Sequence, residues 1–168
     1  MNRICAVDVE TTGLSVRKGH RVIEVGAVII EEGRLSRTFH SLVSAGKPVS
    51  ASALAVHGIT EEMLAGEPSP EEVYPELARF MEGCRLVAHN ARFDMDFLRS
   101  EFDRQDIPFN PSCDCTLILS RKGLPHLPDH RLMTVYKHFF GKIPDNVQLH
   151  RALADARLAA EVWLKLQK

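Results

Sequence analysis

Apolar residues near the N-terminus fall into three runs with the length and β-branched content of strands. They occupy residues 4–9, 22–30 and 35–43, and the polar turn at residues 31–34 separates the last two. We therefore expect a three-stranded meander at the start of the chain.

The segment after the meander changes from strand spacing to helix spacing. Ser69 is placed as a helix N-cap, Pro70 occupies the first helical position, and Glu72 occupies the capping-box position. The apolar residues that follow recur at helical spacing and are Val73, Leu77, Phe80 and Met81. This pattern predicts a helix that begins at Pro70.

Further elements alternate along the rest of the chain. Residues 85–88 are typical of a short strand, 93–102 of a helix with one apolar stripe, and 149–166 of a closing helix. Several prolines interrupt the segment before the closing helix, where short helices are expected around 116–121 and 132–140. Three strands followed by alternating helices and strands indicate an α/β domain with a mixed sheet.

Composition agrees with one folded unit. The chain has 168 residues, 45% of them hydrophobic, and no repeat or Gly/Ser-rich linker divides it, so we expect a single domain over residues 1–168. With 21 Lys and Arg against 22 Asp and Glu, the formal net charge is −1. This balance argues against binding of polyanions by bulk charge and leaves room for a local basic patch.

Cysteine usage and the N-terminus together favour a cytoplasmic protein. The four cysteines, Cys5, Cys84, Cys113 and Cys115, are scattered along the chain, which favours reduced thiols. The first apolar run reaches Asp8 after four apolar positions, too few for a signal peptide or a membrane span. We therefore expect neither secretion nor membrane insertion.

Carboxylates recur at the ends of the predicted elements. Asp8 and Glu10 close the first strand, and the two-residue period of a strand places both on one face. Asp94 falls in the first turn of a predicted helix, and Asp155 interrupts the apolar stripe of the last helix. A capped turn or helix N-terminus explains Asp8, Glu10 or Asp94 taken alone.

Four carboxylates on separate elements need cations to offset their repulsion if they converge. Oxygen ligands of this kind suit Mg²⁺ or Mn²⁺. Two such ions about 4 Å apart can activate a water and stabilise the leaving oxygen of an in-line displacement at phosphorus. Phosphodiester hydrolysis is therefore the predicted reaction.

His150 is the candidate general base, because a neutral imidazole near a carboxylate cluster can take a proton from water. Four residues separate it from Asp155, so at about 100° per residue the two are about 140° apart around a helix. Both can serve one site only if His150 hangs from the helix start or from the loop before it. His89, by contrast, is interpreted as a hydrogen-bonded structural residue.

Three motifs, in order, resemble those of the DEDDh family of exonucleases. They lie at residues 8–14 (DVETTGL), 89–94 (HNARFD) and 150–155 (HRALAD), and the match spans nearly the whole chain. The segments 56–60 and 114–117 further resemble the proofreading epsilon subunit of bacterial DNA polymerase III and its stand-alone relatives.

The resemblance implies a ribonuclease-H-like fold and 3′→5′ release of nucleoside 5′-monophosphates with two divalent cations, Mg²⁺ or Mn²⁺. It implies that Asp8 bridges the two ions. The remaining metal ligands and the general base that it implies are Glu10, Asp94, Asp155 and His150. The residues that it places around the 3′-terminal nucleotide are Thr11, Thr12, Gly13, Leu14, His57, Asn90 and Phe93.

The resemblance says less about the substrate and the partner than about the reaction. Residues 10–13 resemble the DNA-proofreading enzymes slightly more than the oligoribonucleases, so nucleic acid with a free 3′ end is expected, single-stranded DNA above all. Trimming of RNA 3′ ends stays an alternative. The epsilon subunit docks on its polymerase through a C-terminal extension, whereas this sequence ends at Lys168, just after the last predicted helix. A free-standing exonuclease or an isolated catalytic domain is therefore expected, and polymerase association stays open.

Basic side chains outnumber acidic ones between residues 121 and 142, which predicts contacts with backbone phosphates. The candidates are Arg121, Lys122, Arg131 and Lys137, and a second group is Arg17, Lys18 and Arg21. An ordinary solvated surface is the alternative for both groups.

Three other interpretations stay open at this point. Cys113, Cys115, His126 and His130 can be written as a zinc site, although Pro128 excludes a helical pair of histidines. A non-catalytic nucleic-acid-binding module would have the same fold without the need for all four carboxylates. A metal-dependent phosphatase acting on free nucleotides would need only a mononucleotide pocket.

Overall fold

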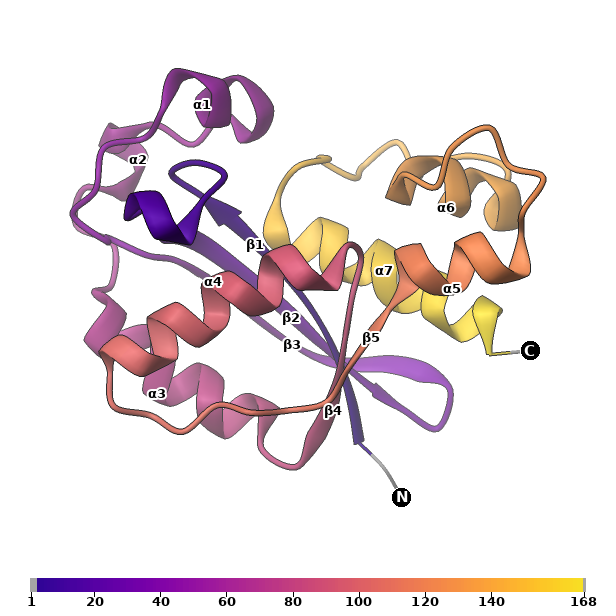
Figure 1. Ribbon diagram of the computed structural model, residues 1–168, viewed down its shortest axis with the longest axis horizontal. Helices are drawn as coiled ribbons and strands as arrows, with labels where there is room; N and C mark the ends of the chain where they lie inside the picture. The colour runs from indigo at the N-terminus through magenta and orange to yellow at the C-terminus, as the bar shows by residue number, and fades with distance from the viewer. Residues whose placement is uncertain (1–2, 168) are drawn as a thin grey trace.

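A five-stranded mixed sheet forms the centre of the computed structural model, which describes residues 3–167 (Figure 1). Its strands are β1 (Arg3–Thr11), β2 (Val22–Glu31), β3 (Arg34–Leu42), β4 (Cys84–Ala88) and β5 (Cys113–Cys115). The spatial order is β3-β2-β1-β4-β5. The first three strands form the predicted antiparallel meander, and β4 and β5 continue the sheet in parallel with β1.

Helices cover both faces of this sheet. They are η1 (Val16–Lys18), α1 (Ala51–His57), α2 (Glu61–Leu64), α3 (Pro70–Met81), α4 (Ala91–Arg104), α5 (Thr116–Gly123), α6 (Leu132–Phe140) and α7 (Ala152–Leu166). α3 begins at Pro70 as predicted, with a capping box in which the Ser69 N–H donates to the Glu72 carboxylate at 2.8 Å. Within residues 3–167 no helix has the length and apolar character that crossing a membrane requires.

The two faces of β1 belong to different layers. Cys5, Val7 and Val9 are buried in the hydrophobic cluster that includes α3 and α4. Ile4 and Ala6 pack instead with Ala160 and other residues of α7. Because Asp8 and Glu10 share the parity of Ile4 and Ala6, the strand directs both carboxylates to the α7 side.

Close packing of α7 on β2 brings its first turn to the centre of the sheet. Gly26 lies opposite Asp8 in the strand register. A Cβ atom at Gly26 would lie 2.2 Å from the Leu153 nitrogen and 2.3 Å from the Ala152 carbonyl carbon. Glycine is therefore required at this position, and its absent side chain lets the start of α7 approach β1.

Four elements are absent from the predictions, namely η1, α1, α2 and β5, and the predicted start of the closing helix was wrong. α1 and α2 have caps, at Ser50 and Thr60, but they are too short for an apolar stripe to mark them. β5 contains only three residues, and pairing with β4 rather than apolar content defines it. The closing helix begins at Ala152 rather than at residue 149, because Arg151 still has an extended backbone.

Candidate active site

Three carboxylates converge where the end of β1 meets the first turn of α7. Asp8, Glu10 and Asp155 each offer one oxygen, and these oxygens all lie within 4.8 Å of one another. Among residues 3–167, no other group of three His, Cys, Asp or Glu side chains brings its ligand atoms together in this way. The strand period explains Asp8 and Glu10, and the contact of α7 with Gly26 explains Asp155.

Asp94 approaches the same place from the first turn of α4. It is buried, and one of its carboxylate oxygens accepts a hydrogen bond from the Val9 N–H at 3.2 Å. Val9 lies between Asp8 and Glu10 in β1, so this bond fixes Asp94 to the strand that carries them. The sequence predicted that Asp94 joins the cluster, and the structure places it beside the three converging carboxylates rather than among them.

Burial raises the pKa of every one of these carboxyl groups, and repulsion from neighbouring carboxylates raises it further. Burial is the largest cause, and it raises the pKa of Glu10 and of Asp94 to about 8 and that of Asp155 to about 6. The pKa of Asp8 is raised well above its usual range by burial and then by the neighbouring carboxylates. Four negative charges here need protons or cations to offset them, and the all-oxygen donor set fits a divalent cation.

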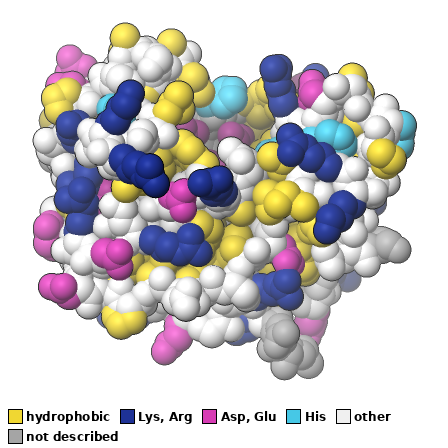
Figure 2. All heavy atoms as spheres, in the orientation of Figure 1, with side chains coloured by type: hydrophobic (Ala, Val, Ile, Leu, Met, Phe, Trp, Pro, Cys, Tyr) yellow, Lys and Arg dark blue, Asp and Glu magenta, His cyan; other side chains and the backbone are white. Residues whose placement is uncertain are grey.

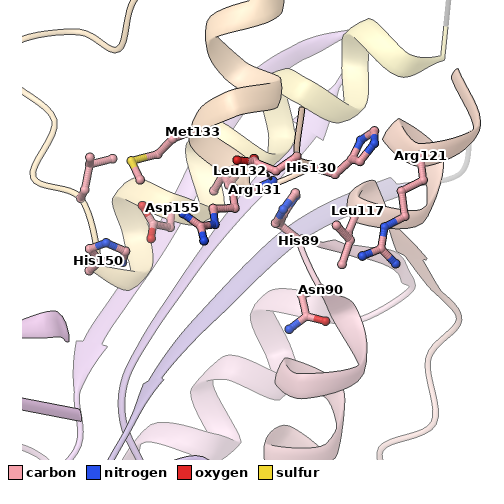
Figure 3. Close-up of a pocket in the computed structure, with 12 residues that line it drawn as sticks. His89, Asn90, Leu117, Arg121, His130, Arg131, Leu132, Met133, His150 and Asp155 are labelled. Atoms are coloured by element: carbon pink, nitrogen blue, oxygen red, sulfur yellow. Dashed lines mark hydrogen bonds between the residues drawn. The ribbon is translucent and has the colours of Figure 1, made fainter. Parts of the chain in front are cut away.

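His150 lies in the loop immediately before α7. Its backbone is left-handed, with φ of 56°, and the helix begins two residues later. The spacing of His150 and Asp155 required such a position in the loop, and the structure provides it. Figure 3 shows the two side chains close together at one end of a cleft. The exposed imidazole is accessible to water and to a ligand in the cleft.

A cleft of about 530 Å³ extends away from His150 and Asp155 (Figure 3). His89 and Asn90 line it from the turn before α4, and Arg131 lines it from the residue before α6. Its apolar lining consists of Leu117, Leu132, Met133 and Leu149. Figure 2 shows a hollow between the part that holds α1 and the part that holds α6, with acidic side chains at its floor.

Two of the four predicted phosphate contacts between residues 121 and 142 line this cleft. Arg121 and Arg131 are exposed and belong to its wall, whereas Lys122 and Lys137 are exposed outside it. The cleft therefore has Asp155 at one end, two guanidinium groups along its length and one further carboxylate, Asp129, in its wall. A strand with one negative charge per phosphate matches this arrangement once cations offset the carboxylates.

Arg21 is not available as a phosphate contact. Its guanidinium donates to both carboxylate oxygens of buried Glu101, at 2.7 and 2.8 Å, and to the Ala45 carbonyl at 3.4 Å. Glu101 also accepts the Val22 N–H at 3.1 Å. The interpretation of Arg21 as a phosphate contact was therefore wrong, because the fold uses its charge to neutralise a buried carboxylate. Arg17 and Lys18, by contrast, are exposed.

The turn after β1 uses its threonine hydroxyls internally. The Thr11 hydroxyl donates to the Gly13 carbonyl at 2.8 Å, and the Thr12 hydroxyl accepts the Arg21 N–H at 3.0 Å. Leu14 is instead 81% exposed, a large value for an apolar side chain. The parts of this segment that can contact a ligand are therefore its backbone turn and the Leu14 side chain.

His57 and Phe93 are also engaged within the protein. The His57 Nδ1 accepts the Ile59 N–H at 3.0 Å, which leaves Nε2 to donate to the Thr11 carbonyl at 3.1 Å. Burial lowers the pKa of His57, so the ring is neutral and holds the turn after β1. Phe93 is half-buried, with its ring centroid 4.9 Å from that of Phe97.

The zinc-site interpretation finds no support in the described part of the chain. Cys113 and Cys115 lie on β5 and pack against the core cluster that includes α4. The His130 Nδ1 lies 3.1 Å from the Ser120 hydroxyl instead. His89, interpreted as structural, lies 2.9 Å from the Thr116 hydroxyl through its Nδ1, and burial lowers its pKa to about 4.

Glu24 is a buried charged residue near the site that the motifs do not include. It lies opposite Glu10 in the strand register and is completely buried. Burial alone would raise its pKa, but hydrogen bonds from His40, Arg151 and the Ala152 N–H lower it to about 2. A glutamate in the middle of an apolar strand is the signal that could have found it.

Comparison with known proteins defines the family. The exonuclease family model, RNase_T, matches residues 5–163. The chain belongs to the exonuclease family. The match covers the end of β1 and the first turns of α4 and α7, so all four carboxylates and His150 lie inside it. Members of this family use divalent metal ions, in agreement with the oxygen donor set.

Relatives of this exonuclease include DNA polymerase III proteins. The DNA polymerase III subunit epsilon of Pasteurella multocida is 34% identical over 173 residues, which cover 98% of this chain and 68% of that protein. The PolC-type DNA polymerase III of Caldanaerobacter subterraneus is 36% identical over 159 residues, 95% of this chain. The chain spans only 11% of the length of that relative.

A solved structure confirms the fold. Exonuclease X, in a complex with 5′ overhanging duplex DNA, superposes with a TM-score of 0.75 at 30% identity, over 99% of this chain and 91% of that one. The predicted resemblance to DEDDh exonucleases and the predicted α/β, ribonuclease-H-like fold are therefore confirmed.

Proposed function

We propose that this exonuclease hydrolyses DNA from a free 3′ end and releases nucleoside 5′-monophosphates. The observation that carries the proposal is the convergence of Asp8, Glu10 and Asp155 within 4.8 Å, next to a histidine on a loop and at the end of a cleft. A cleft with two arginines suits a chain of phosphates better than a single small anion.

The carboxylates are the proposed ligands for two divalent ions. Asp8, Glu10 and Asp155 are near enough to share one ion, and Asp94 lies on the side where a second would be held. Mg²⁺ or Mn²⁺ is the proposed identity, because every donor is a carboxylate oxygen. When bound, such ions neutralise charge on the phosphate and lower the pKa of the attacking water.

His150 is the proposed general base. Its imidazole is exposed beside Asp155, so a nitrogen can accept the proton of a water that attacks the terminal phosphate. Its place in the loop lets it face the ligand while Asp155 holds its position in the helix.

The cleft is the proposed path of the substrate strand. Arg121 and Arg131 would contact phosphates, Asn90 would lie near the terminal nucleotide, and the exposed Leu14 would contact its base. Thr11, Thr12, Gly13, His57 and Phe93 would shape the nucleotide site through the turn and the packing that they hold. Lys122 and Lys137 would contact phosphates only beyond the cleft.

DNA is proposed as the substrate, with RNA as the alternative. The support for DNA is that the relatives include DNA polymerase III proteins and that Exonuclease X has been solved with duplex DNA. The same relatives make a DNA polymerase a proposed partner.

The test is a time course with 5′-labelled single-stranded DNA and RNA of matching sequence, in Mg²⁺, in Mn²⁺ and in EDTA. We expect a metal-dependent ladder that shortens from the 3′ end, faster on DNA, and no ladder with Asp8→Ala. A faster ladder on RNA would identify an exoribonuclease. If neither polymer is cut and the variant behaves like wild type, the chain is a non-catalytic binding module; cleavage of free nucleotides alone would identify a phosphatase.

A further inference from the structure

A buried cluster ties the segment before α7 to the central sheet. The Glu24 carboxylate accepts hydrogen bonds from the Arg151 Nε at 3.0 Å and from its Nη2 at 2.7 Å. It also accepts the Ala152 N–H at 3.0 Å and lies 2.7 Å from the His40 Nε2. Glu24 is therefore both the partner of Arg151 and the acceptor of the first backbone N–H of α7.

The residue next to this cluster is the proposed general base. Arg151 directly follows His150, whose backbone is left-handed, with φ of 56°, a conformation that is uncommon for a non-glycine residue. The His150 side chain is exposed, whereas the Arg151 side chain is 22% exposed and bound at two nitrogens. The chain on the C-terminal side of His150 is thus fixed by contacts that His150 itself does not make.

We propose that Glu24 and Arg151 are positioning residues for His150. Together they fix the backbone that carries the imidazole, so that it stays beside Asp155 while the strand enters the cleft. This inference rests on the proposed function, because it assigns the pair to the proton-transfer step. Asp155 has separate support from the contact of α7 with Gly26, and its backbone N–H also donates to the Arg151 carbonyl at 3.0 Å. The Mg²⁺ dependence therefore has to be measured with kcat, to separate an effect on His150 from one on Asp155.

A purely structural role for the pair can be separated from a positioning role by a matched control in the same chain. Arg21 and Glu101 form a second buried pair, with two hydrogen bonds of 2.7 and 2.8 Å. The exposed fractions are similar: 17% and 1% for Arg21 and Glu101, and 22% and 0% for Arg151 and Glu24. Each glutamate also accepts one backbone N–H.

The first experiment compares Glu24→Gln with Glu101→Gln. Each substitution leaves a buried arginine without its counter-charge, so both should lower the melting temperature. We expect Glu24→Gln to lower kcat on single-stranded DNA by roughly 10–100-fold, with KM and the Mg²⁺ dependence changed less than about 3-fold. Glu101→Gln should keep kcat within about 2-fold of wild type. Equal losses of kcat in the two variants would overturn the proposal.

The second experiment is a double-mutant cycle with Arg151→Met and His150→Ala. If Arg151 acts through His150, removing it from a protein that already lacks the histidine should change kcat less than about 3-fold. The same loss of kcat in both backgrounds would overturn the proposal. Should Arg151→Met not fold, Arg151→Lys replaces it, because lysine keeps the charge and loses the two-pronged contact. Absence of cleavage by the wild type would refute the proposed function itself.

Discussion

Removal of the Asp155 charge should stabilise the metal-free protein while it abolishes activity. Burial raises the pKa of Asp155 from its ordinary 3.8 to about 6. Because the pKa is raised in the folded state, this carboxyl group does not reduce the free energy of unfolding below about pH 4. The free energy of unfolding then falls as the pH rises through 6. The rise in pKa corresponds to a loss of about 3 kcal/mol in the free energy of unfolding above pH 7. Asp155→Asn should recover this loss.

Thermal unfolding measured by circular dichroism in EDTA tests this expectation. For a domain of this length, about 3 kcal/mol corresponds to a melting temperature roughly 6–12 °C higher for the variant than for wild type at pH 8. At pH 4 the free energies of unfolding of the two proteins should differ by less than about 1 kcal/mol. In saturating Mg²⁺ the advantage of the variant should shrink or reverse, because the wild type gains more from the ion.

Asp103→Asn is the control, because it removes an exposed carboxylate on α4 and should change the melting temperature by less than about 2 °C. Lower stability of Asp155→Asn than of wild type at pH 8 in EDTA would refute the reasoning. A stabilisation of equal size at pH 4 and pH 8 would do so as well, because it would not come from the charge.

Other predictions concern the remaining site residues. Asp8→Ala should abolish hydrolysis and leave the far-ultraviolet circular dichroism spectrum unchanged; turnover at the wild-type rate would exclude Asp8 from the site. His150→Ala should slow turnover by roughly 10²–10⁴-fold while Mg²⁺ still raises the melting temperature, and loss of that rise would make His150 structural. Arg131→Ala should reduce the slope of log K for DNA binding against log salt concentration by about one, the amount expected for one lost phosphate contact. Lys137→Ala, outside the cleft, should reduce this slope less.

Local patterns predicted the parts of the fold that neighbours in the chain determine. The three strands of the meander and the start of α3 follow from apolar runs, a polar turn and a capping box. α1, α2 and β5 escaped prediction, because they are short and because their neighbours in space, rather than their own periodicity, stabilise them.

The candidate site shows the same division. The strand period put Asp8 and Glu10 on one face, and the spacing before Asp155 required His150 to leave the helix; the structure agrees on both. The interpretation of Arg21 as a phosphate contact was wrong, because the local pattern of basic residues contains no sign of the buried Glu101 that Arg21 binds.

The sequence by itself determined the family motifs, the meander and the residue types of the site. Only the tertiary structure decided which charged groups meet. Asp94 reaches Val9 across 85 residues, and Arg151 reaches Glu24 across 127. Spacing along the chain fixes the face on which a side chain lies, but its partner depends on how sheet and helices pack. Contacts between distant segments therefore decided which charges the fold neutralises internally and which it leaves for a ligand.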